Sequence, residues 1–130
     1  MSHLGGNMSL GWIRLRRVTV TLVLLFVSTF LVFGHAILVK SFPQANEIVS
    51  GPVVPVALTF NSRVDQARST LTLENPDHST SKVPIDVDRS SPEKLLSKLS
   101  LSTPGLYKLR WQVLAVDGHI TRGEIPFQVK

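Results

Sequence analysis

Beyond residue 34, hydrophobic and polar residues alternate along most of the chain. In residues 106–116, Tyr107, Leu109, Trp111 and Val113 occupy every second position. This period of two is typical of strands that bury one face and expose the other. The alternation, together with short apolar runs bounded by turns, predicts strands over residues 36–41, 54–60, 70–74, 82–88, 95–101, 106–116 and 124–129.

Turn-forming residues separate these segments. They are Ser50-Gly51-Pro52, Asn75-Pro76-Asp77, Ser90-Ser91-Pro92 and Thr103-Pro104-Gly105. Short strands with such spacing predict an all-β fold, a single seven-stranded antiparallel sandwich. We expect Trp111, Phe60 and Phe127 in its core. Residues 91–99 also fit the spacing of a helix, and we interpret them as a strand because the segment is short.

The first 34 residues have a different pattern. Arg14, Arg16 and Arg17 precede an uncharged apolar run over residues 18–33, which ends at Gly34. A positive region, an apolar core and a small residue are typical of a secretory signal peptide. We therefore predict a signal peptide over residues 1–34 and an exported domain over residues 35–130, which begins with His35. The alternative is an uncleaved inner-membrane anchor, for which the run is borderline because spans need about 17–25 residues.

Composition and charge exclude several classes of function for this protein. The chain of 130 residues has no cysteine, which excludes zinc fingers, iron–sulfur centres and disulfide-built miniproteins. Its net charge of +5 and pI of about 10.1 are compatible with a nucleic acid partner. Three of the 14 Lys and Arg precede residue 35 and all nine acids follow it, which leaves 11 − 9 = +2 for residues 35–130. Without a basic cluster there, we expect no binding to nucleic acid.

One constellation of residues indicates a metal site. Cleavage after Gly34 gives His35 a free amine beside its imidazole, and the amine and Nδ1 together can chelate one ion. Asp117 and His119 flank Gly118 in the connection before the last strand, where a glycine permits an unusual backbone turn. Three nitrogens and one carboxylate oxygen favour Cu(II), which also heads the Irving–Williams order. An isolated Asp117-Gly118-His119 would otherwise be interpreted as an ordinary polar turn.

Several stretches together resemble one known family. They are His35-Ala36, Ser41-Phe42-Pro43-Gln44-Ala45, Val56-Ala57-Leu58-Thr59-Phe60, Pro104-Gly105-Leu106-Tyr107-Lys108, the run from Trp111 to His119, and the run from Arg122 to Val129. With these stretches, residues 35–130 resemble the CopC family of periplasmic copper-binding proteins. The resemblance implies a Greek-key sandwich of the cupredoxin or immunoglobulin-like type. It also implies Cu(II) held by the mature amino terminus, His35, Asp117 and His119.

The chain departs from the family pattern at two places. Residues 35–130 contain no methionine, so the methionine Cu(I) site of some members is absent. Ser62 stands where some members have an acidic residue, so any axial carboxylate is lost or replaced by water. Near the site in sequence, Glu124 is a candidate to orient His119 or to pair with Arg122. His78 is interpreted as an exposed turn residue.

These observations leave three functions open. The first is a periplasmic, monomeric Cu(II) carrier or buffer in copper resistance or import, not an enzyme, and the resemblance suggests a CopD-type inner-membrane transporter as its partner. The second is a copper-dependent oxidative enzyme, which the carboxylate of Asp117 disfavours because it fills the position that oxygen would need. The third is a metal-free sandwich that binds a partner, which retention of the leader would favour.

Overall fold

The structure, a computed structural model, describes residues 35–130, so the predicted signal peptide over residues 1–34 lies outside the described residues. The described domain contains eight strands and one short 3₁₀ helix. These are β1 (Leu38–Phe42), β2 (Glu47–Val49), β3 (Val53–Phe60), η2 (Gln66–Arg68), β4 (Thr70–Glu74), β5 (Thr80–Val83), β6 (Lys94–Ser100), β7 (Gly105–Leu114) and β8 (Ile120–Val129). Within residues 35–130, no helix has the length and apolar character needed to cross a membrane.

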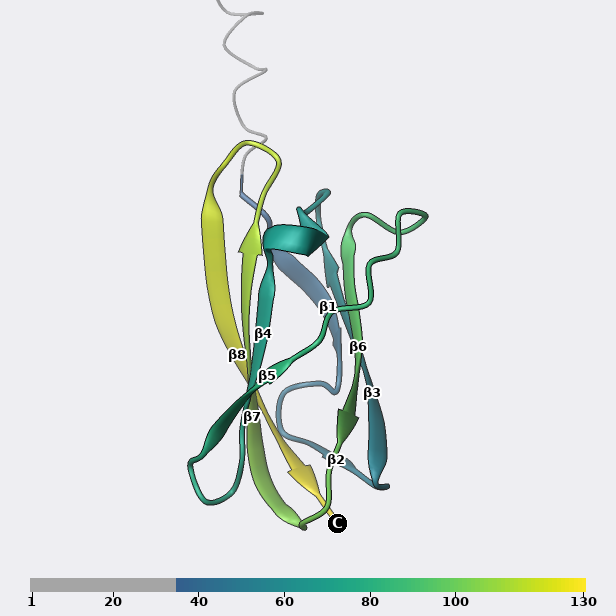
Figure 1. The fold of residues 1–130 in the computed structure, drawn as a ribbon, viewed down its shortest axis with the longest axis vertical. Helices are drawn as coiled ribbons and strands as arrows, with labels where there is room; N and C mark the ends of the chain where they lie inside the picture. The colour runs from purple at the N-terminus through teal and green to yellow at the C-terminus, as the bar shows by residue number, and fades with distance from the viewer. Residues whose placement is uncertain (1–34) are drawn as a thin grey trace, which may run out of the picture. The chain divides into compact units, whose positions relative to one another are not determined.

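The strands form two sheets that lie face to face (Figure 1). One sheet has the order β1-β3-β6, and the other has the order β2-β8-β7-β4-β5. Along the chain, β2 lies in the other sheet from β1 and β3, and the chain changes sheet again between β3 and β4, between β5 and β6, and between β6 and β7. These crossings are Greek-key connections, and they confirm the predicted all-β sandwich.

The core lies between the inner faces of the two sheets. Trp111 on β7 and Phe60 on β3 meet edge to face across it, with ring centroids 5.2 Å apart. Tyr107 and Phe127 stack at 5.6 Å between β7 and β8. Trp111, Phe60 and Phe127 are all buried, as the alternation predicts. Such aromatic contacts stabilise a core beyond the burial of their area.

The sequence predicts seven strands where the structure has eight. The additional strand is β2, which has three residues and is too short to show a period of two. It pairs with β8 in parallel, so the second sheet is mixed rather than purely antiparallel. Its first residue, Glu47, lies opposite Phe127 in that pairing. Two backbone hydrogen bonds close to this pairing, from Asn46 to Pro126 and from Lys130 to Val49, hold β2 against β8.

Two predicted strands have a boundary that is wrong by more than two residues. The strand expected over residues 82–88 ends at Val83, because Pro84 has no N–H to continue the ladder. Beyond it the chain turns to the other sheet, where Asp86 forms an isolated bridge with Leu96. β8 begins at Ile120 rather than at residue 124, because its first residues pair with β7 without apolar alternation. The strand expected over residues 95–101 forms as β6, shifted by one residue to Lys94–Ser100.

Candidate metal centre

The loop between β7 and β8 presents two of the predicted ligands. The Ala115 N–H donates to the His119 carbonyl at 2.8 Å, and the Gly118 N–H donates to the Ala115 carbonyl at 3.0 Å. Gly118 has a φ of 89°, in the left-handed region that glycine adopts without a steric penalty. This tight loop holds Asp117 and His119 at the end of the hairpin, in a fixed relation to each other.

Asp117 and His119 are joined by two hydrogen bonds. The His119 backbone N–H donates to Asp117 Oδ1 at 3.1 Å, and His119 Nδ1 lies 2.7 Å from Asp117 Oδ2. A carboxylate only accepts, so Nδ1 carries the proton and the neutral ring keeps its lone pair on Nε2. The arrangement therefore presents His119 Nε2 as the nitrogen for a metal, with Asp117 orienting the ring.

The charge of Asp117 is stabilised by its surroundings. The hydrogen bond from the His119 backbone is the largest cause that lowers the pKa of Asp117 below its ordinary value. The hydrogen bond from the His119 side chain and the charges of His119 and His35 lower that pKa further, while partial desolvation opposes them. Asp117 is therefore an anion at neutral pH beside both histidines.

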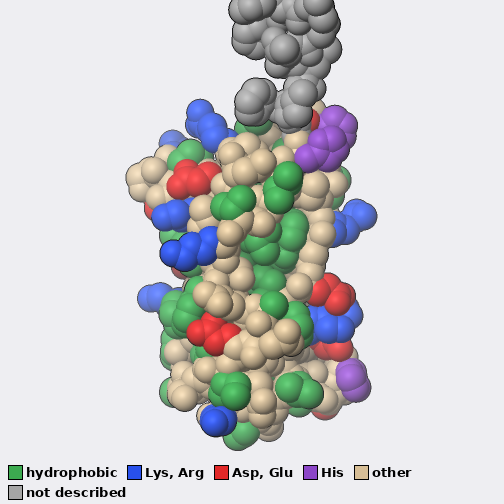
Figure 2. Space-filling model, turned by 180° about the vertical axis from the view of Figure 1, so that it is seen from behind, with side chains coloured by type: hydrophobic (Ala, Val, Ile, Leu, Met, Phe, Trp, Pro, Cys, Tyr) green, Lys and Arg blue, Asp and Glu red, His purple; other side chains and the backbone are tan. Residues whose placement is uncertain are grey.

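His35 lies against His119, although the two residues come from opposite ends of the described domain. Their rings stack with centroids 4.8 Å apart and an angle of 25° between the planes. The loop between β7 and β8 and the start of β1 lie at the same end of the sandwich (Figure 1). Both side chains are exposed, and histidine side chains reach the surface near both ends of the domain (Figure 2).

Hydrogen bonds to backbone groups hold the two histidine segments in place. The Thr121 hydroxyl donates to the Ala36 carbonyl at 2.8 Å. Asn61 Oδ1 accepts from the Ile37 N–H at 2.8 Å, and the Asn61 N–H donates to the Ile37 carbonyl at 2.9 Å. The connection after β3 also bridges to Ala115, at the start of the loop. No local motif marks Thr121 or Asn61 in the sequence, because each contacts a residue far away along the chain.

The side chains alone do not complete a metal site. Among the side chains of residues 35–130, no three His, Asp or Glu residues are arranged around one point. Both oxygens of Asp117 accept hydrogen bonds from His119. His35 and His119, which the sequence predicts as ligands, lie together, and the predicted amino-terminal nitrogen depends on cleavage outside the described residues.

Glu124 does not orient His119, contrary to the sequence-based expectation. Its carboxylate contacts Arg110 Nε at 3.0 Å and Lys108 Nζ at 3.5 Å on the neighbouring strand. Arg122 donates instead to Gln112. Positions along β8 alternate between the two faces of the sheet, and Glu124 lies on the outer face. His78 is an exposed turn residue, as expected, and contacts Glu74 at 3.2 Å.

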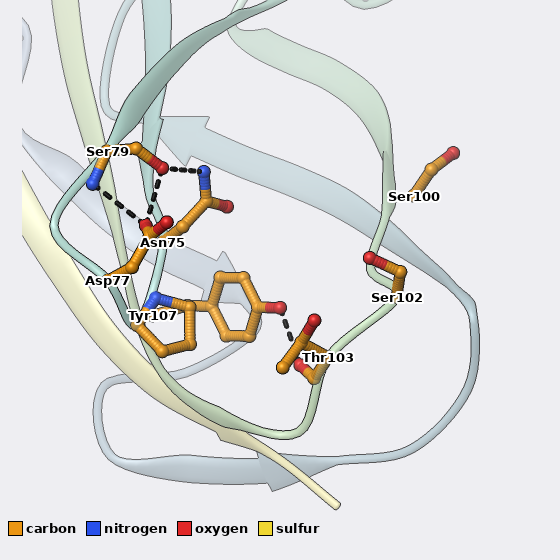
Figure 3. A pocket seen from close by; sticks show the side chains of 8 residues that line it. Asn75, Asp77, Ser79, Ser100, Ser102, Thr103 and Tyr107 are labelled. Carbon is orange, nitrogen blue, oxygen red and sulfur yellow. Dashed lines mark hydrogen bonds between the residues drawn. The ribbon is translucent and has the colours of Figure 1, made fainter.

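A hollow of about 320 Å³ lies between the turn after β4 and the connection that leads into β7, at the end of the sandwich opposite the β7–β8 loop (Figure 1). Figure 3 shows the side chains that line it. Four of its polar residues, Asn75, Asp77, Ser79 and Tyr107, bind one another or nearby backbone. Ser79 donates to Asp77, Asn75 donates to Ser79, and the Tyr107 hydroxyl donates to the Thr103 carbonyl at 2.6 Å. These contacts give the hollow a structural role in closing the turns, and the histidine pair at the opposite end is the better candidate site.

Comparison with known proteins places the domain in a family. A model of the CopC domain matches residues 38–130, a range that contains Asp117 and His119 and begins after His35. Protein YobA of Escherichia coli K12 is 32% identical over 101 residues, which cover 76% of this chain and 82% of YobA. The copper transport protein CutJ of Bacillus subtilis is 27% identical over 103 residues, which cover 75% of this chain and 18% of CutJ.

Solved structures agree with this assignment. CopC from Methylosinus trichosporium OB3b superposes with a TM-score of 0.65 and 26% identity, over 74% of this chain and 94% of that chain. PcoC, a methionine-rich copper resistance protein from Escherichia coli, has the same fold, with a TM-score of 0.60 and 23% identity over 75% of this chain and all of that chain. The family match, the relatives and the shared sandwich together show that this chain belongs to the CopC family.

Proposed function

We propose that residues 35–130 form an exported carrier or buffer for copper, which binds one Cu(II) ion between His35 and His119. Cleavage after Gly34 would supply the amine of His35 as a further nitrogen. Asp117 would orient His119 or add a carboxylate oxygen. Nitrogen ligands with a carboxylate favour Cu(II) over other divalent ions. The names of CutJ and PcoC, which refer to copper transport and copper resistance, support copper as the cargo.

The stacked pair of His35 and His119 carries this proposal. With metal–nitrogen bonds of about 2 Å, two nitrogens on one ion lie at most about 4 Å apart. Rings with centroids 4.8 Å apart can meet that limit with small rotations of the side chains. Two histidines from distant parts of the chain, exposed and next to an anionic carboxylate, form a suitable entrance for a cation.

The proposed site predicts a pH dependence of copper affinity. An α-amine has an ordinary pKa of about 7.7–8.0 and must lose its proton to bind a metal. Copper binding would therefore release protons, and affinity would fall as the pH falls. A titration of Cu(II) affinity between pH 5 and pH 8 measures this slope. A flat profile would argue against the amine as a ligand.

Native mass spectrometry of the protein exported from a bacterial host tests the whole proposal. We expect a mass that begins at His35, and one bound copper after addition of one equivalent of Cu(II). A protein that begins at another residue, or one that begins at His35 but retains no copper, would contradict the proposed copper carrier. Size-exclusion chromatography with light scattering on the same sample tests the expected monomer.

Single substitutions then test the ligands. His119→Ala should weaken Cu(II) binding by orders of magnitude without unfolding the domain, because its side chain is 61% exposed. His78→Ala is the matched control, since that side chain is also exposed but lies on the turn after β4. Asp117→Asn should cost about 10–100-fold in affinity if Asp117 orients His119. Equal affinity of His119→Ala and the parent protein would refute the site.

One added serine ahead of His35 isolates the contribution of the amine. The addition leaves both imidazoles in place and moves the amine away from the ion. We expect Cu(II) affinity to fall by orders of magnitude. If the extended protein binds copper as tightly as the protein that begins at His35, the amino-terminal chelate is wrong.

We further propose a copper transporter in the inner membrane, of the CopD type, as the partner. The support is that CutJ, a longer copper transport protein, contains a region similar to this domain. The copper-loaded domain should lose copper faster to vesicles that contain the transporter than to empty vesicles. Equal loss to both would contradict a direct transfer.

The proposal assigns no catalysis to the domain. If Asp117 adds its carboxylate oxygen to the ion, that oxygen fills a position that O₂ would need on the metal, which favours binding over turnover. In a peroxide-driven oxidation assay, we expect the copper-loaded domain to be no more active than free Cu(II). Activity above that level, lost in His119→Ala, would favour the oxidative enzyme instead.

A further inference from the structure

We propose that Thr121 is a positioning residue for the copper site, whose hydroxyl keeps the His35 segment next to His119. The inference rests on the proposed function, because it concerns the same histidine pair. The Thr121 hydroxyl donates to the Ala36 carbonyl at 2.8 Å. Ala36 directly follows His35 and is only 1% exposed, so this carbonyl is held in a buried and fixed position.

This hydrogen bond joins segments that lead into different sheets. The His35 segment leads into β1 of the three-stranded sheet, whereas His119 precedes β8 of the five-stranded sheet. Asn61 binds both backbone groups of Ile37, but Asn61 follows β3 and so belongs to the three-stranded side. Among the hydrogen bonds within residues 35–130, the bond from Thr121 is the direct link between the His35 segment and the β7–β8 hairpin.

Metal affinity depends on such a link. A ligand pair that is already in place loses little freedom when the ion binds, and a pair that must be brought together binds more weakly. Groups that orient metal ligands typically contribute about 10–100-fold to affinity. Thr121 would act on the site indirectly, because its hydroxyl binds the backbone carbonyl of Ala36, the residue after His35, and not a proposed ligand nitrogen.

Two substitutions at this position separate the hydroxyl from the rest of the side chain. Thr121→Val keeps the branched shape and removes the donor, whereas Thr121→Ser keeps the donor and removes a methyl group. Competition against a chelator of known Cu(II) affinity then measures binding of the protein that begins at His35. We expect Thr121→Val to bind Cu(II) about 10–100-fold more weakly and Thr121→Ser to remain within about threefold of the parent protein. Thr70→Val, at an exposed position on β4, is the control for a general loss of threonine.

A spectroscopic readout distinguishes positioning from simple loss of stability. The electron paramagnetic resonance spectrum of fully loaded Thr121→Val should show a broadened or altered Cu(II) signal, and that of Thr121→Ser should match the parent. Affinities are compared at a temperature where circular dichroism shows each variant folded. If Thr121→Val does not fold, Thr121→Ala replaces it with the same expected loss, because it also lacks the donor.

The outcomes separate this inference from the proposed function. If the parent protein retains no copper, or if His119→Ala binds as tightly as the parent, the copper site itself is wrong. If the parent binds copper through His119 but Thr121→Val keeps both parental affinity and spectrum, Thr121 does not position the site. Loss of affinity in Thr121→Ser equal to that in Thr121→Val would also overturn the role of the hydroxyl.

Discussion

Substitution of Gly123 by alanine should destabilise the domain through a single contact in the core. Gly123 on β8 lies opposite Trp111 on β7, and the indole packs over the glycine. A Cβ atom at residue 123 would lie 2.6 Å from Trp111 Cε2 and 2.8 Å from Nε1, and it would also meet Cζ2. The backbone of Gly123 is not in the left-handed region, so the cost is steric rather than conformational.

The surroundings of the indole set the size of this effect. Trp111 cannot move away freely, because it is buried and packs edge to face with Phe60 at 5.2 Å between centroids. A crowded core side chain costs about 1–3 kcal/mol, out of a total stability of about 5–15 kcal/mol for a domain. For a domain of this size, each kcal/mol lowers Tm by about 4–8 °C. We therefore expect a clear fall in Tm for Gly123→Ala.

Urea unfolding followed by far-UV circular dichroism measures the effect, with Trp111→Phe as the matched background. The phenyl ring lacks the indole atoms that the new methyl group would meet. Gly123→Ala should therefore cost less in Trp111→Phe than in the parent, with a coupling energy of about 0.5–3 kcal/mol. A loss below about 0.5 kcal/mol in the parent, or equal losses in both backgrounds, would refute the steric argument.

Three further predictions follow from other contacts. Gln66→Ala should cost about 2–4 kcal/mol of unfolding free energy, since this buried amide donates to the carbonyls of Asp88, Ser91 and Lys94. Chemical denaturation measures this loss, and a much smaller loss would show that those bonds contribute little. Tyr107→Phe should cost about 0.5–1.5 kcal/mol by the same measurement, because it removes one hydrogen bond to Thr103, and no loss would contradict that. Hydrogen bonds lower the pKa values of four carboxylates, so the stability that these groups contribute is present at neutral pH and is lost as the pH falls below about 4. Thermal melts measure this effect, and an unchanged Tm down to pH 3 would contradict it. These carboxylates are Glu74, Asp77, Asp88 and Asp117.

The sequence determined the fold class because the burial of one face imposes a period of two. The run from Tyr107 to Val113 is buried at every second position, as its alternation predicts. The family resemblance could also be recognised from short stretches, and so could the polar turn Asp117-Gly118-His119, whose hydrogen bonds are local. Features that depend on neighbours within a few residues were therefore accessible without a structure.

The tertiary structure decided the features that depend on contacts between distant segments. β2 was not predicted, because a three-residue strand has no measurable period and depends on pairing with β8. Glu124 pairs with Arg110 across the sheet rather than with His119, because the face on which a strand residue lies is fixed by register. The bond from Thr121 to Ala36 joins two sheets, and no local pattern encodes such a contact. The sequence thus names the histidines, and the packing of the two sheets brings them together.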